Sequence, residues 1–287
     1  MRISVVHSTV YRYQKPVHPE PHTFRLRPRD DAAQRLIRFA LEISPSPAGR
    51  NECLDQDGNV VTEAWFNGPL TELAARSSFE VETLRENPFD YLPHVPAAAY
   101  PEPLRSALAP YLEAENPSGP VSGFAAAIAA AEGRGTLPFL TALNQRMFET
   151  FRHVTRDDGP AHPPEITLRD GEGTCRDMAV LFCSACRTMG IAARFVSGYE
   201  REAALQERAD MHAWAEVYLP GGGWRGYDPS QGLAVATSHV AVAAAADPRL
   251  ASPISGLYRG DARSEMQFTI SMEVELGPSP ASGQLFP

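Results

Sequence analysis

Prolines are so dense in residues 87–103 that this segment constrains the fold more than any other feature of the chain. Each proline fixes φ and removes a backbone N–H, so a regular helix or strand is excluded there. The segment is typical of an extended connector. A chain of 287 residues is long enough for two ordinary domains. We therefore predict a domain over residues 1–90, a connector over 91–103 and a second domain over 104–287.

The first ninety residues are rich in strand signals. An early run of β-branched and aromatic residues extends from Val5 to Tyr13, and residues 36–43, 60–66 and 79–84 alternate between apolar and polar. The triplet Asp57-Gly58-Asn59 indicates a turn between two of these runs. Helical periodicity is hard to find. We predict a β-rich, sandwich-like N-terminal domain.

The second domain mixes helices and strands, which places the whole chain in the α+β class. Helical patterns cover residues 104–115, 123–132 and 138–151, and strand patterns cover 191–199, 211–219 and 224–228. Residues 265–276 also alternate as a strand. This last strand either completes the sheet of the second domain or returns to the N-terminal domain, and the pattern does not decide between them.

Cys175 stands at the start of the clearest helix of the chain. Met178, Leu181 and Phe182 begin an apolar stripe at helical spacing, and Thr174 with Asp177 forms a capping-box pattern. Cys175 is thereby predicted as the first helical residue, at the positive end of the helix dipole. A thiol in that position loses its proton more readily, and the thiolate is the nucleophile.

Two other cysteines, Cys183 and Cys186, fall on the same predicted helix, and we predict that they are structural. Along a helix that rises about 1.5 Å per residue, Cys183 lies roughly 12 Å from Cys175 and Cys186 lies farther, so a disulfide between them is excluded. Cys183 and Cys186 have a spacing known from metal sites, but a structural zinc site needs two more ligands and none is nearby. We interpret the pair as small core residues.

A predicted hairpin carries His212 and Asp228. Residues 211–219 alternate strictly, residues 220–223 turn the chain, and residues 224–228 begin the return strand. A turn centred on Pro220 places His212 and Asp228 opposite each other, with Cβ atoms about 5 Å apart. A turn centred between Gly221 and Gly222 instead places Ala215 opposite Asp228. Both registers stay open because the glycines permit a bulge.

Thiol, imidazole and carboxylate are the parts of a cysteine nucleophile with a base and a group that orients the base. Taken singly, each residue is more typical of a structural role: a helix-start cysteine, a strand histidine and an aspartate before Pro229 are all common. Together, in this order and on these elements, Cys175, His212 and Asp228 satisfy the nucleophile–base–orienter logic.

Four segments resemble the core of the bacterial transglutaminase-like superfamily: GTCRD at 173–177, RFVSGY at 194–199, HAWAEV at 212–217 and GWRGYDP at 223–229. The specific resemblance covers residues 139–232. Residues 7–13 (HSTVYRY) and 25–29 (RLRPR) are similar to the β-rich domain that precedes this core in one bacterial branch. The resemblance implies a papain-like fold, in which helices pack on an antiparallel sheet.

By this resemblance, Cys175 attacks a carboxamide or peptide carbonyl to form a thioester, His212 holds the thiolate and protonates the leaving amine, and Asp228 fixes the imidazole. The backbone N–H of Cys175 is expected to donate to the oxyanion. Relatives use a second donor from an upstream side chain. Asn144 and Gln145 are the candidates here. Two aromatic residues, Tyr199 and Trp214, either line the cleft or pack in the core.

The resulting hypothesis is a cysteine-dependent amide hydrolase or acyl transferase, acting as a peptidase or isopeptidase on a peptide or protein substrate. A protein-glutamine cross-linking transglutaminase is the nearest alternative, and a binding module with the same fold is another. The sequence contains no acidic loop with the ligand spacing of a calcium site. We expect no metal and no other cofactor.

Charge and hydropathy argue against two classes of binding partner, nucleic acids and membranes. The formal net charge of -9 argues against sequence-independent nucleic-acid binding, which needs a basic surface. The most apolar run, residues 240–246, is too short to span a bilayer, and the N-terminus lacks a signal-peptide pattern. We therefore expect a cytoplasmic protein without a membrane partner. The oligomeric state stays open.

Overall fold

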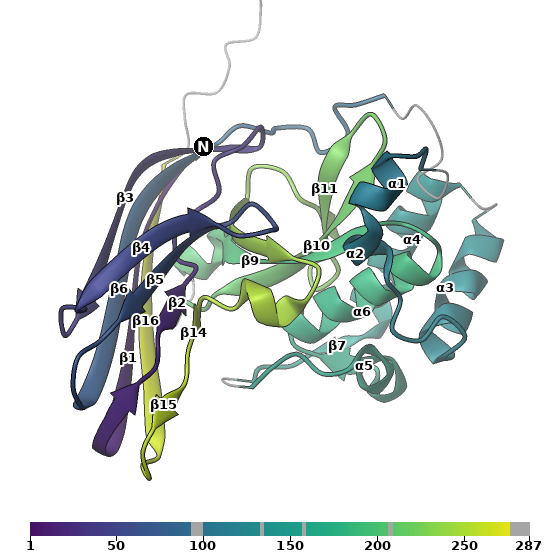
Figure 1. Ribbon diagram of the computed structural model, residues 1–287. Coiled ribbons are helices and arrows are strands. Elements are labelled where there is room, and N and C mark those ends of the chain that lie inside the picture. Colours follow the sequence, from purple (N-terminus) through teal and green to yellow (C-terminus); the bar gives the residue numbers. More distant parts are fainter. Residues whose placement is uncertain (93–99, 133–134, 157–158, 206–208, 276–287) are drawn as a thin grey trace, which may run out of the picture.

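The chain forms two lobes in a computed structural model, one made of strands and one made of helices and a second set of strands (Figure 1). The structure describes residues 1–92, 100–132, 135–156, 159–205 and 209–275. Part of the predicted connector, residues 93–99, lies outside the described residues. Within the described residues, no helix is long and apolar enough to cross a membrane.

The strand lobe consists of two antiparallel sheets. One has the order β15-β1-β6-β3, with β16 also paired to β1, and the other has the order β14-β2-β5-β4. The strands are β1 (Arg2–Pro19), β2 (His22–Phe24), β3 (Gln34–Ser44), β4 (Gly49–Leu54), β5 (Val60–Trp65), β6 (Leu70–Thr83), β14 (Ile254–Ser255), β15 (Tyr258–Arg259) and β16 (Ser264–Glu275).

Both ends of the described chain build this lobe. The final strand, β16, runs antiparallel to β1 with Arg2 opposite Glu275 and Tyr13 opposite Ser264. The short strands β14 and β15 pair with β2 and β1 in the same way. The strand whose partner the sequence left open therefore joins the N-terminal sheet, as do two short strands that the pattern did not reveal.

The second lobe packs helices on a five-stranded antiparallel sheet of order β12-β11-β10-β9-β13. Its helix α6 (Cys175–Thr188) is almost surrounded by apolar neighbours, with Met178, Leu181 and Phe182 fully buried. The sheet strands are β9 (Ala193–Glu200), β10 (His212–Leu219), β11 (Gly223–Asp228), β12 (Leu233–Ala234) and β13 (His239–Ala245). The predicted α+β class is confirmed, with helices on an antiparallel sheet beside a β-rich part.

The helices differ from the predicted ones in two places. The pattern over 104–115 forms two single turns, because Pro110 lacks the N–H that a continuing helix needs. A short helix, α5, forms at residues 164–170, where no helix was predicted. The remaining elements are α1 (Leu104–Ala107), α2 (Ala109–Leu112), α3 (Pro120–Ala131), α4 (Thr136–Thr150), β7 (Arg152–His153), α5 (Pro164–Asp170), β8 (Glu172–Gly173), and the 3-10 turns η1 (Arg201–Leu205) and η2 (Pro248–Ala251).

Neither predicted register of the β10–β11 hairpin is correct. Ala215 lies opposite Tyr227 and Leu219 lies opposite Gly223, so the loop is centred on Gly221. Gly221 and Gly223 have φ values of 87° and 68°, which is why glycines occupy the turn. This register still leaves His212 and Asp228 on the same face, as diagonal rather than directly opposed neighbours.

Carboxamide side chains join the two lobes along the edge of β13. Gln34 donates to the carbonyl of Ala241 and accepts from its N–H, at 2.9 and 2.8 Å. Asn59 does the same with Ala244, at 2.9 and 2.8 Å. These contacts satisfy backbone groups of an edge strand that would otherwise be open to pairing. The strand lobe is thus fastened directly to the sheet that carries His212.

Candidate active site

Cys175 is the first residue of α6, as the sequence predicts, and a capping box fixes that helix start. The Thr174 hydroxyl accepts from the Asp177 N–H, and the Asp177 carboxylate accepts from the Thr174 N–H at 2.8 Å. Asp177 is fully buried and also accepts two hydrogen bonds from Arg156, at 2.8 and 2.9 Å. The capping box and the ion pair with Arg156 therefore fix the backbone at Cys175, the candidate nucleophile.

Donors around Asp177 hold its charge in the interior. Burial by itself raises the pKa of the Asp177 carboxyl, but Arg156, the His162 N–H and Thr174 outweigh it and bring the pKa well below the ordinary value. Asp177 is accordingly a fixed negative charge at neutral pH, placed one turn into the helix that begins with Cys175.

The thiol of Cys175 is surrounded by donors. Burial raises its pKa, whereas hydrogen bonds from His153, His212 and the Ala213 N–H lower it, and the net result is a pKa of about 6. An ordinary cysteine titrates near 8.5. Cys175 is therefore a thiolate at neutral pH. Cys183 and Cys186, on the same helix, are buried, and burial raises the pKa of both thiols.

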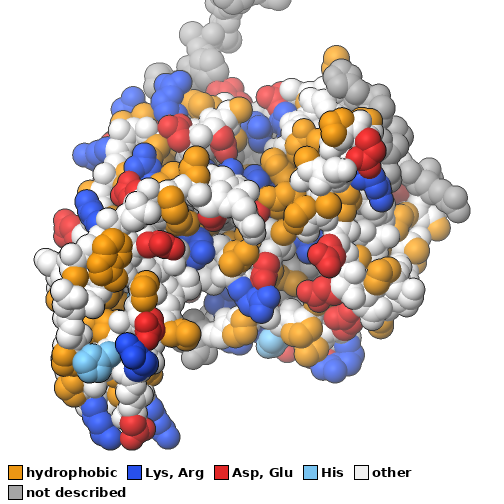
Figure 2. All heavy atoms as spheres, in the orientation of Figure 1, with side chains coloured by type: hydrophobic (Ala, Val, Ile, Leu, Met, Phe, Trp, Pro, Cys, Tyr) orange, Lys and Arg blue, Asp and Glu red, His pale blue; other side chains and the backbone are white. Residues whose placement is uncertain are grey.

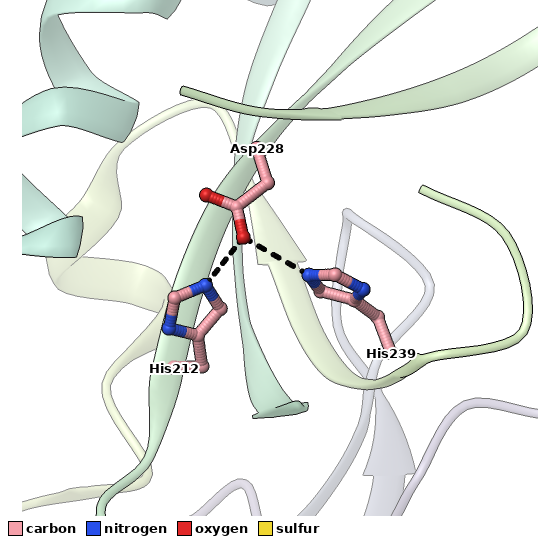
Figure 3. A group of neighbouring side chains, drawn as sticks. All are labelled: His212, Asp228 and His239. Carbon is pink, nitrogen blue, oxygen red and sulfur yellow. Dashed lines mark hydrogen bonds and ion pairs between the residues drawn. The ribbon is translucent and has the colours of Figure 1, made fainter. Parts of the chain in front are cut away.

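His212 and Asp228 form a direct hydrogen bond (Figure 3). His212 Nε2 lies 2.6 Å from Asp228 Oδ2. Nδ1 is therefore the nitrogen left for the hydrogen bond between His212 and the Cys175 thiol. Burial lowers the pKa of His212, but the carboxylate and the thiolate raise it, so that the pKa lies well above 6.5. The resulting pair is a thiolate beside an imidazolium.

Asp228 receives four hydrogen bonds and is fully buried. His239 Nε2, from β13, lies 3.1 Å from the same oxygen that meets His212 (Figure 3). The other oxygen accepts from the Ser230 N–H at 3.0 Å and from its hydroxyl at 2.7 Å. Burial opposes ionisation, but these donors and the two imidazoles bring the pKa of Asp228 far below the ordinary value.

The three side chains His212, Asp228 and His239 have possible ligand atoms within 4.8 Å of one another. Both imidazoles, however, direct Nε2 to a single carboxylate oxygen at hydrogen-bond distance, which is the arrangement of an oriented imidazole rather than of ligands spread around an ion. We therefore interpret this group as a hydrogen-bonded network.

The candidate nucleophile opens into a large cavity between the lobes, with a volume of about 1220 Å³. Figure 2 shows the surface hollowed between the two lobes. The second lobe contributes Cys175, His153 and His212 to the lining, and the strand lobe contributes Tyr11 and Phe268. A substrate in this cavity therefore contacts both lobes.

Comparisons with known proteins agree with this architecture. Residues 3–82 match the bacterial transglutaminase-like N-terminal region, and residues 123–229 match the transglutaminase-like superfamily. The chain belongs to the transglutaminase-like superfamily. The match over 123–229 includes Cys175, His212 and Asp228, while His239 lies beyond it.

Similar proteins extend over nearly the whole length of this transglutaminase-like chain. An uncharacterized protein of Mycobacterium leprae is 27% identical over 281 residues, covering 94% of this chain and 98% of the relative. An uncharacterized protein of Mycobacterium tuberculosis is 27% identical over 296 residues, covering 96% and 93%. A Cytophaga hutchinsonii crystal structure, described as a "putative cysteine protease", has a TM-score of 0.71 at 20% identity and covers 97% of this chain and 93% of its own. The last likeness shows that the fold is shared.

The structure corrects the position of four other candidates. Tyr199 and Trp214 are 0% and 1% exposed and pack in the core, because their strands are covered on both faces. Asn144 donates to the Leu233 carbonyl at 3.2 Å, and Gln145 donates to Glu149 on the outer face of α4. Neither amide reaches the cavity that contains Cys175. Of the two alternatives for Tyr199 and Trp214, core packing is the correct one, and the prediction of an oxyanion donor on α4 is wrong.

Two histidines of this transglutaminase-like site were not predicted. His153 lies in β7, directly opposite Gly173 in the parallel pair with β8, and this pairing brings its side chain to the thiol. His239 begins β13, an alanine-rich run whose pairing with β9 brings it next to Asp228. No local sequence signal distinguishes either histidine. His153 is placed by a parallel strand pairing and His239 by a strand at the edge of the sheet, and both are long-range features.

Proposed function

We propose that this protein is a cysteine-dependent amide hydrolase of transglutaminase-like type, acting as a peptidase or isopeptidase. The supporting observation is the continuous contact from the Cys175 thiol through His212 to Asp228, at the wall of a cavity large enough for a polypeptide. A thiolate with a pKa of about 6 supplies a nucleophile at neutral pH without a metal-bound water.

The first half of the reaction forms a thioester. The Cys175 thiolate attacks the amide carbonyl carbon, a C–S bond forms, and the carbonyl electrons move to oxygen. The Cys175 N–H, unused by the helix at its first position, donates to this oxyanion. His212 then gives its proton to the leaving nitrogen, the C–N bond breaks, and the amine departs while Asp228 keeps the imidazole oriented.

The second half releases the acyl group. His212, now neutral, takes a proton from water as the water oxygen attacks the thioester. The C–S bond breaks, and the thiolate returns beside an imidazolium. An amine in place of water gives transfer instead of hydrolysis. We propose water as the usual acceptor, because Cys175 is partly exposed and lines the cavity.

His153 supplies the second oxyanion donor in this proposal. Its side chain hydrogen-bonds the thiol and lines the same cavity, whereas Asn144 and Gln145 do not reach it. Replacement His153→Phe is expected to lower kcat by about 10²-fold, the usual loss of one oxyanion donor, with little change in KM. An equal loss of kcat in His153→Asn, which keeps an N–H donor, would contradict this role.

The test begins with the thiol itself. Iodoacetamide at pH 6 to 7 should label Cys175 stoichiometrically and faster than Cys53, which is exposed. Peptide, isopeptide and glutamine-plus-amine substrates then distinguish hydrolysis from transfer, with Cys175→Ala as the inactive control. Labelling of Cys175 no faster than Cys53, or full amidase activity in Cys175→Ala, would refute the proposal. Isopeptide formation exceeding hydrolysis would identify a cross-linking transglutaminase.

A further inference from the structure

One face of the β1–β16 pair extends from the contact between the lobes into the cavity. Cross-strand pairs follow one another at every second residue on this face. In order, the pairs are Ile3 with Val274, Val5 with Met272, His7 with Ile270, Thr9 with Phe268, and Tyr11 with Met266. The face therefore forms a ladder of five rungs whose two ends have different surroundings.

The first rungs are used by the contact between the lobes. Ile3 and Val5 are 0% and 1% exposed and pack with Tyr199 and Val240 of the second lobe. His7, on the third rung, closes this contact with a hydrogen bond to the Tyr199 hydroxyl, at 2.7 Å. Up to this point the β1 side of the ladder is buried in the contact between the lobes, and His7 also reaches the edge of the cavity.

The last rungs leave the interface and line the cavity that contains Cys175. We call Tyr11, Phe268 and Met266 the apolar wall. Tyr11 and Phe268 are partly exposed, and the Met266 side chain belongs to a residue that is 41% exposed. The wall therefore continues the contact between the lobes with apolar side chains that are partly exposed and line the cavity.

The spacing of the wall matches an extended polypeptide. Successive rungs of an antiparallel pair lie about 6.8 Å apart, which is also the separation of side chains i and i+2 in an extended chain. The cavity volume of about 1220 Å³ exceeds the 300–1,000 Å³ usual for small-molecule sites. The cavity lined by both the thiol and the wall therefore has room for a segment of several residues.

We propose that the apolar wall of the strand lobe is a substrate subsite, which binds an extended polypeptide with apolar side chains at alternate positions beside the scissile amide. This inference rests on the proposed role of Cys175 and adds a function for the strand lobe. The strand lobe then selects the substrate, while the second lobe carries the reacting groups.

Thiol alkylation tests the wall without knowledge of the natural substrate. Peptidyl chloromethyl ketones carry their chain on the acyl side of the thiol, and N-iodoacetyl peptides carry it on the amine side. In both cases the Cys175 thiolate displaces halide, so that a C–S bond forms and chloride or iodide leaves. Each probe is made in two versions, with leucine or with serine at two alternate positions, and iodoacetamide serves as the reagent without a chain.

With the wild-type protein, the leucine version of at least one probe should alkylate Cys175 about tenfold faster than the serine version, corresponding to one buried apolar side chain. Met266→Ser and Phe268→Ala should each reduce this preference, and Phe268→Leu should largely restore it. Thr269→Ala, an exposed position on the opposite face of β16, is the matched control and should keep the full preference.

The outcomes separate the two proposals. Leucine and serine probes that react equally fast, or a leucine preference that survives Met266→Ser and Phe268→Ala, would overturn the wall. The proposal would also be overturned if these variants lowered the rate with iodoacetamide as much as the rate with the leucine probe. The substitutions would then change the reactivity of the thiol itself and not the binding of the chain. Failure of iodoacetamide to prefer Cys175 over Cys53 in the wild type would instead refute the nucleophile.

Discussion

Two buried aspartates near Cys175 differ in their hydrogen-bond partners. From this difference we infer that one aspartate supports the fold and that the other takes part in the proposed chemistry. Asp177 and Asp228 are both 0% exposed, and both have a pKa far below the ordinary value because several donors outweigh burial. Arg156 is the charged partner of Asp177, and it does not titrate near neutral pH. His212 and His239 are the partners of Asp228, and His212 also contacts the Cys175 thiol.

The comparison shows that a buried, strongly ionised carboxylate does not by itself mark a site of reaction. The guanidinium of Arg156 and the backbone groups at the helix start make Asp177 an anchor for the position of Cys175. In the proposed mechanism, the imidazoles link the charge of Asp228 to proton transfer at the thiol. The following predictions test this division, from the largest expected effect to the smallest.

Asp228→Asn should have the largest effect on activity. The amide nitrogen would meet donors that now face a carboxylate, so His212 would adopt the wrong tautomer and lose the support of its positive charge. We expect kcat to fall by about 10²- to 10⁴-fold while the protein remains folded. The measurement is amidase kinetics beside far-UV circular dichroism. Retention of more than a tenth of wild-type kcat would contradict the assigned role.

Asp177→Asn should act mainly on stability. Removal of this charge replaces the ion pair of the partly buried Arg156 with a contact to a neutral amide, at a cost of roughly 2–3 kcal/mol in the free energy of unfolding. Denaturant titration measures this cost, and Asp170→Asn, at an exposed pair with Arg169, is the control expected to leave stability unchanged. A loss of kcat as large as that of Asp228→Asn, with stability unchanged, would reverse the comparison.

The pH dependence of that stability has a definite sign. The pKa of Asp177 is lower in the folded protein than in the unfolded chain, so its contribution is present above the unfolded value near 3.9 and is lost as the pH falls below it. The stability difference between wild type and Asp177→Asn should therefore be full at pH 7 and shrink progressively below about pH 4.

Local sequence patterns predicted the helix start around Asp177 better than the hydrogen-bonded group around Asp228. The capping box of Thr174 and Asp177, the helix-start position of Cys175 and the shared face of His212 and Asp228 all depend on neighbours close in sequence. The hairpin register was wrong because the three glycines allow several turns, and Gly221 proved to be the centre.

The residues that sequence reasoning missed are those placed by long-range pairing. His239 reaches Asp228 through β13, whose position depends on pairing with β9, and His153 reaches the thiol through the parallel contact of β7 with β8. Asn144 was wrongly predicted as an oxyanion donor, because its position on α4 directs the side chain to the Leu233 carbonyl. The return of β16 to β1 likewise needed a partner that no local pattern specifies.

His239→Phe should have an intermediate effect. It removes one donor from the Asp228 oxygen that orients His212, and we expect kcat to fall roughly tenfold with KM little changed, in line with a single hydrogen bond to a charged group. His239→Gln retains an N–H donor and should recover most of kcat. Steady-state kinetics at several pH values checks both variants. Equal losses of kcat in the two variants would mean that ring packing, not donation, matters.

The smallest effect concerns the pH at which Cys175 becomes reactive. Since its pKa is about 6, the rate of iodoacetamide alkylation in the wild type should rise through pH 6 and then level off. Amide hydrolysis should rise over the same range but fall at higher pH, as His212 passes its raised pKa and no longer protonates the leaving amine. The two profiles should therefore coincide at low pH and separate at high pH.

Alkylation profiles of the two aspartate variants complete the comparison. Asp228→Asn should move the midpoint upward, because a His212 without its carboxylate holds a proton less tightly and stabilises the thiolate less. Asp177→Asn should leave the midpoint near pH 6, because Asp177 is not among the groups that set the pKa of the thiol. If Asp177→Asn moved the midpoint as far as Asp228→Asn, both carboxylates would belong to the reacting network, and the division between anchor and orienter would fail.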